Sequence, residues 1–73
     1  MQFIKIVSNQ QTIIWVNTDA IASIEDGPQM RTARLYLAGG IQYDVMDGAD
    51  SAKIAVITAA EGKPSHLMRY EPG

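Results

Sequence analysis

Apolar and polar residues alternate along most of the chain from Phe3 to Val45, and this two-residue period is typical of β-strands with one buried side. The segments that carry the alternation are short, rich in branched and aromatic residues, and separated by polar residues, Gly or Pro. They are residues 3–7, 12–16, 21–25, 32–37 and 41–45. We therefore expect a small antiparallel sheet of four or five strands.

The most clearly marked hairpin spans residues 32–45. Leu35 and Leu37 share one side of its first strand because side chains alternate between the two sides. Gly39 and Gly40 predict a tight turn, since glycine accepts positive φ angles at little cost. The residues expected to face the core from this hairpin are Ala33, Leu35, Leu37, Ile41, Tyr43 and Val45.

The period changes at Asp47, after which apolar residues recur at the spacing of an α-helix. Asp47 is a favourable N-cap residue, and Asp50 favours the positive end of the helix. Gly62 predicts the end of the helix, because glycine is favoured just past a helix C-terminus, and Pro64 opposes its resumption. The residues expected near its buried side are Ala52, Val56, Ile57 and Ala60.

These elements predict an α+β domain over residues 1–62, with the sheet followed by one C-terminal helix. The pattern leaves open whether the sheet stays flat or curls into a small barrel. Residues 63–73 read as a C-terminal tail. Because Leu67, Met68 and Tyr70 are apolar, we expect the tail to pack against a surface, such as that of a neighbouring subunit.

A domain of this size has few ways to be stable alone. The chain has 73 residues, of which 47% are hydrophobic and 19% charged, and it contains no cysteine for a disulfide. Small domains without disulfides or metals depend on an efficient core or on oligomerisation. We therefore expect a homo-oligomer.

One helix covers only one side of a sheet, and here the other side is also apolar. If Ile4, Ile6 and Val16 face the helix, their neighbours along the strands face away from it. Either a barrel encloses these neighbours, or they contact another copy or another protein. With the apolar tail residues, the predicted interaction surface comprises Phe3, Val7, Ile13, Trp15, Tyr36, Leu67, Met68 and Tyr70.

Charge gives little support to nucleic-acid binding. The formal net charge is −2, and the six basic residues are scattered along the chain. An alternative reading is a small nucleic-acid-binding barrel that uses Arg31 and Arg34 with Tyr36 and Trp15. A solvated strand edge explains the two arginines more simply.

The sequence offers no set of residues for catalysis, for a cofactor or for a metal ion. It lacks a glycine-rich phosphate loop, and Ser65-His66 lacks a third group to orient the histidine. We therefore expect a protein that is not an enzyme, although a small-ligand site between subunits could use His66 and Tyr70. The chain has no run of about 20 apolar residues, and Met1–Val7 reads as a strand rather than a signal peptide. We expect a cytoplasmic protein.

Two segments of the chain resemble a known family. Residues 15–25, which read WVNTDAIASIE, precede Pro28 and then residues 35–45, which read LYLAGGIQYDV. This run is similar to the small flagellar proteins of the FlbD/SwrD type, and the resemblance covers residues 3–57. It implies a bacterial motility accessory protein without catalysis, and similar runs also occur in other bacterial and phage proteins. The function we favour is a non-catalytic protein-interaction module that self-associates.

Overall fold

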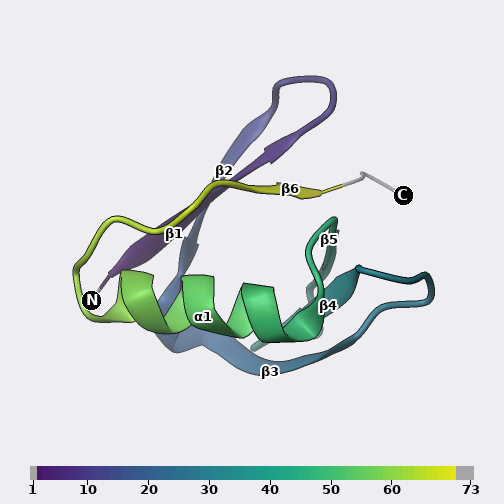
Figure 1. Ribbon diagram of the computed structural model, residues 1–73. Helices are drawn as coiled ribbons and strands as arrows, with labels where there is room; N and C mark the ends of the chain where they lie inside the picture. The colour runs from purple at the N-terminus through teal and green to yellow at the C-terminus, as the bar shows by residue number, and fades with distance from the viewer. Residues whose placement is uncertain (1, 71–73) are drawn as a thin grey trace.

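Over residues 2–70, the chain forms one six-stranded sheet with a single α-helix along one side (Figure 1). In the computed structural model, which describes residues 2–70, the strand order is β2-β1-β6-β5-β4-β3. The elements are β1 (Phe3–Ser8), β2 (Ile13–Asn17), the 3₁₀ turn η1 (Thr18–Ala20), β3 (Ile21–Asp26), β4 (Ala33–Leu37), β5 (Gln42–Val45), α1 (Ala49–Ala60) and β6 (Met68–Tyr70).

The α+β class and the two predicted hairpins are confirmed, but the predicted count of four or five strands and the purely antiparallel arrangement are wrong. The sheet has six strands, and it is mixed because β6 runs parallel to β1 while the other neighbours pair antiparallel. It is also open rather than closed into a barrel, with β2 and β3 as its two edges. The side of the sheet away from α1 is therefore not enclosed by the sheet itself.

The sixth strand comes from the segment that was predicted to be a tail. After α1 the chain turns at Gly62, which has a φ of 76°, and returns so that β6 lies between β1 and β5. Met68 pairs with Ile6, and Tyr70 lies opposite Val45. Both Met68 and Tyr70 are buried within the subunit, which corrects the expectation that they pack on a neighbour. Residues 71–73 of the predicted tail lie outside the described residues.

The core lies between the sheet and α1. The helix contributes only alanine side chains to the fully buried set, namely Ala52, Ala55 and Ala59. Small side chains let the helix lie close to a sheet surface of larger aliphatic groups, which fills the space between them. The buried apolar residues of the strands are Ile4, Ile6, Val16, Ala33, Leu35, Val45, Met68 and Tyr70.

The helix is rotated relative to the prediction. Ala52 is buried as expected and Val56 is half-buried, but Ile57 and Ala60 are exposed. Ala52, Ala55 and Ala59 recur along the side of α1 that faces the sheet, and Ile57 therefore lies on the opposite, exposed side. Ile41 is likewise exposed instead of buried, because it belongs to the turn before β5.

The helix also begins differently from the prediction. Its N-cap is Gly48, which makes no side-chain capping hydrogen bond, while Asp50 lies in the first turn as expected. The Asp47 carboxylate accepts a hydrogen bond from His66 instead, at 2.8 Å between Oδ2 and Nε2. The Asp47–His66 hydrogen bond therefore links the segment before β6 to the start of the helix.

A bulge explains how β3 places two isoleucines on the same side at an odd spacing. Ile21 pairs with Leu37 and Ile24 pairs with Leu35, with a register shift between Ile21 and Ser23. Simple alternation would place Ile24 on the side opposite to Ile21. The extra residue in the bulge turns Ile24 back toward the core. Ile21 and Ile24 therefore both pack against the core.

The central position of β6 predicts that neighbouring residues differ sharply in their effect on stability. Met68→Ala should lower the free energy of unfolding by about 2–5 kcal/mol, because it opens a cavity in the core. Leu67→Ala is the matched control, since Leu67 is 53% exposed and should change the free energy by about 0.5 kcal/mol or less. Urea unfolding at one protein concentration measures both. Small and equal effects would contradict the assignment of β6 to the core.

Candidate functional site

The side of the sheet away from α1, here called the outer face, carries a cluster of apolar side chains on the β1–β2 hairpin. Phe3 is 49% exposed, Ile13 is 50% exposed and Trp15 is 62% exposed. Val7 lies opposite Ile13 in the strand register and completes the cluster. We call Phe3, Val7, Ile13 and Trp15 the hairpin patch.

The local sequence explains why this hairpin is apolar on both sides. In β2 the run Ile13-Ile14-Trp15-Val16 has no polar residue, so alternation places apolar groups on the core side and on the outer face alike. Ile14 and Val16 point inward and pack with the core, while Ile13 and Trp15 point outward. Large side chains exposed in a contiguous group on a small domain are typical of a binding surface.

Lys5 is the one charged residue that the hairpin places among the patch residues. It lies directly opposite Trp15 in the register, and its Nζ is 5.8 Å from the centroid of the indole ring. At this distance the ammonium is attracted by the negative face of the ring. The pair orients the indole and leaves most of its area accessible.

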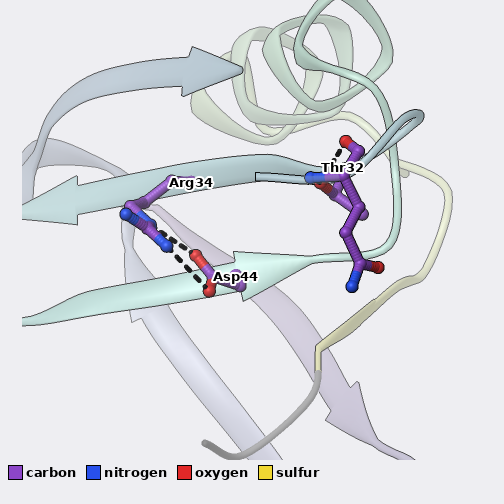
Figure 2. A network of polar contacts seen from close by, with 4 residues as sticks. Thr32, Arg34 and Asp44 are labelled. Atoms are coloured by element: carbon purple, nitrogen blue, oxygen red, sulfur yellow. Dashed lines mark hydrogen bonds and ion pairs between the residues drawn. The ribbon is translucent and has the colours of Figure 1, made fainter. Parts of the chain in front are cut away.

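The other half of the outer face is polar. Arg34 on β4 and Asp44 on β5 are opposite each other in the register, and Figure 2 shows their side chains meeting between the two strands. Arg34 Nε donates to Asp44 Oδ1 at 2.7 Å, and Nη2 donates to Oδ2 at 3.2 Å. These hydrogen bonds hold the pKa of Asp44 below its ordinary value. The outer face is thus divided into an apolar half and a polar half.

The residues of the predicted interaction surface do not all come together. Four of them, Phe3, Val7, Ile13 and Trp15, form the hairpin patch. Tyr36 lies on the polar half of the outer face, opposite Gln42 and separated from β1 by β5 and β6. Leu67 is exposed just before β6. Met68 and Tyr70 are buried in the core and are therefore not part of an interaction surface.

The two arginines of the predicted nucleic-acid patch are in different situations. Arg34 is committed to Asp44, so its charge is already compensated. Arg31 lies in the loop between β3 and β4, where it is exposed and has a φ of 61°. The structure therefore does not bring the pair together as two free cations on a common surface.

His66 has two polar neighbours that the sequence did not indicate. Its Nε2 is 2.8 Å from Asp47 Oδ2 and 3.3 Å from Ser51 Oγ. A nucleophile–base–acid relay needs the hydroxyl and the carboxylate on opposite ring nitrogens, but here both meet the same one. The cluster therefore joins the segment before β6 to the N-terminal end of α1 without the geometry of a catalytic triad.

Tyr70, which was considered with His66 for a ligand site between subunits, is buried beside Tyr43. The two rings meet edge to face with centroids 5.6 Å apart. Tyr70 is therefore part of the core and is not available to such a site. Over residues 2–70, no group of three or more His, Asp or Glu side chains is placed to bind a metal ion.

Comparison with protein-family models, with curated proteins and with solved structures finds no match to this chain. The resemblance to FlbD/SwrD-type proteins thus stays a prediction. Within the described part of the chain, α1 falls short of the length and apolar character that a membrane-spanning helix needs.

The Arg34–Asp44 pair predicts a pH dependence of stability. Because folding lowers the pKa of Asp44, the pair stabilises the fold above the ordinary aspartate pKa of about 3.9, and this contribution is lost as pH falls through the folded-state pKa. Asp44→Asn should therefore be less stable than the wild type at neutral pH, with the difference shrinking in acid. Urea unfolding of both proteins from about pH 7 to about pH 2.5 measures it. A difference that does not change with pH would contradict the assignment.

Proposed function

We propose that this protein is a non-catalytic protein-interaction module that self-associates through the outer side of the β1–β2 hairpin and binds another protein. The observation that carries the proposal is Trp15, which is 62% exposed in the middle of a strand. Tryptophan is one of the three residue types enriched at the energetic centres of protein interfaces. Phe3 and Ile13 surround it with further exposed apolar area.

The position of α1 relative to the hairpin supports an open binding surface on the outer side of β1 and β2 rather than a pocket. The helix α1 lies along the inner side of the sheet, and the far end of the hairpin extends past it (Figure 1). Among residues 2–70, no helix or strand packs over the outer side of β1 and β2. A patch on an open sheet suits a broad protein surface, whereas small ligands are held in concave sites with convergent polar groups.

The chemistry of the patch supports binding without catalysis. Its four side chains are hydrocarbon or indole groups. Of the charged residues beside it, Lys5 is engaged with the Trp15 ring, and Arg69 lies next to Val7 in the strand register. Apolar burial is non-directional and favours association without a reacting group. The polar cluster around His66 joins the start of α1 to the segment before β6 and includes none of the patch residues.

Self-association should depend on the side chain of Trp15. Sedimentation of the wild-type protein from about 1 µM to about 1 mM should give a mass that rises with concentration. Trp15→Ser should weaken the association on the order of tenfold or more, because it removes the largest group of the patch.

Ile54→Ser provides a matched control for this experiment. Ile54 is also 62% exposed and apolar, but it lies on α1 and not on the outer face. The control should associate like the wild type. A wild-type protein that stays monomeric over the whole range, or equal weakening by both substitutions, would refute the proposed surface.

A further inference from the structure

The two edges of the sheet differ in how they are protected against pairing with another strand. The β3 edge contains a bulge and carries Glu25 and Asp26, and both features oppose the addition of a strand. The β2 edge has a regular register with β1 over all five of its residues. It contains neither a charged residue nor a proline.

Hydrogen bonds at both ends of the hairpin define which backbone groups of β2 face the open edge. Ser8 N–H donates to the Thr12 carbonyl, and Thr18 N–H donates to the Gln2 carbonyl, both at 2.9 Å. Thr12 and Thr18 therefore direct their backbone groups toward β1. Since this direction alternates along an antiparallel strand, Ile14 and Val16 also face β1. The N–H groups of Ile13, Trp15 and Asn17 point away from β1.

We propose that the partner in self-association is a second copy of this chain, joined edge to edge by antiparallel pairing of the two β2 strands. The inference rests on the proposed function and specifies it: the copies join at the β2 edge, which sets the two hairpin patches side by side on one face of the joined sheet. The adjacent Trp15 rings then cover part of each other, and the remaining apolar area is left for the second protein. The two-fold axis passes beside Trp15, so that Trp15 lies opposite the partner's Trp15. Such a pair exchanges two backbone hydrogen bonds.

This register matches the side chains on both sides of the joined sheet. On the inner side, Ile14 lies opposite the partner's Val16, so the two cores become continuous across the junction. On the outer side, the two Trp15 rings are adjacent, and Ile13 lies opposite the partner's Asn17. Every residue keeps the side that it occupies in the single subunit, because opposite residues in an antiparallel pair share a face.

Charge favours a second copy as the occupant of this edge. The chain has a net charge of −2, yet its β2 strand is uncharged, so two β2 strands meet without like charges opposite each other. The nearest ammonium, that of Lys5, belongs to β1 and lies over the Trp15 ring. By contrast, two β3 edges would bring Glu25 and Asp26 of both copies close together.

Amide hydrogen exchange of the full chain tests this arrangement residue by residue. In the associated protein, the amides of Ile13 and Trp15 should exchange about tenfold or more slowly than in dilute monomer, because they donate to the partner strand. The amides of Ile14 and Val16 are the internal control, since they are bonded to β1 in either state. Association that leaves Ile13 and Trp15 exchanging at the monomer rate would overturn the edge pairing while keeping the proposed function. A protein that is monomeric at every concentration would refute both.

A proline substitution tests the same edge through the backbone. Ile13→Pro removes an N–H that does not bond to β1, so the hairpin should persist, as circular dichroism can verify. The proline should weaken association about tenfold or more, whereas Ile13→Val, which keeps the N–H, should change it about threefold or less. Undiminished association of a folded Ile13→Pro protein would overturn the proposal. So would protection of the Ile13 and Trp15 amides only on addition of a different protein.

Discussion

A single twelve-residue helix can bury only one side of a six-stranded sheet, and most features of this molecule follow from that constraint. The inner side is closed by a helix surface of alanines, which approaches the sheet closely. The outer side is divided. Around β4 and β5 it is stabilised by the Arg34–Asp44 pair and tolerates water, whereas around β1 and β2 it carries the hairpin patch. The apolar part of the outer side is therefore local to the β1–β2 hairpin. It borders the β2 edge, which has no bulge and no charged residue to oppose pairing with another strand.

The short strand β6 joins the two halves of the sheet. Without it, the β1–β2 hairpin and the β3–β4–β5 meander would share no strand pairing among the described residues. Three residues suffice because Met68 and Tyr70 fill the core on either side of Arg69, and because Arg69 accepts the Met46 N–H through its carbonyl at 2.7 Å. The His66–Asp47 hydrogen bond holds the approach to this strand against the start of the helix. The C-terminal segment thus determines how the hairpin patch is oriented relative to the rest of the molecule.

Local patterns predicted the elements whose contacts are close in sequence. The hairpin around Gly39 and Gly40 is confirmed, and both glycines have the positive φ angles that such a turn requires. The exposed position of Trp15 follows from alternation in an uninterrupted apolar run. The pairing of β6 with β1 could not be predicted in this way, because it joins residues about sixty positions apart through a strand of three residues. The only signal was the alternation of Met68, Arg69 and Tyr70, which is too short to separate a strand from an irregular segment. The helix rotation was missed because the demand for small residues comes from the opposing sheet and not from the helix itself.

The fluorescence of the single tryptophan gives the most direct test of the central claim that association of the copies covers the Trp15 side chain. Emission and acrylamide quenching of Trp15 are measured as the protein concentration rises from about 1 µM to about 1 mM. The account predicts a water-exposed indole at low concentration, followed by a shift to shorter wavelength and weaker quenching as copies associate. An emission maximum and a quenching constant that stay the same over the whole range would contradict it.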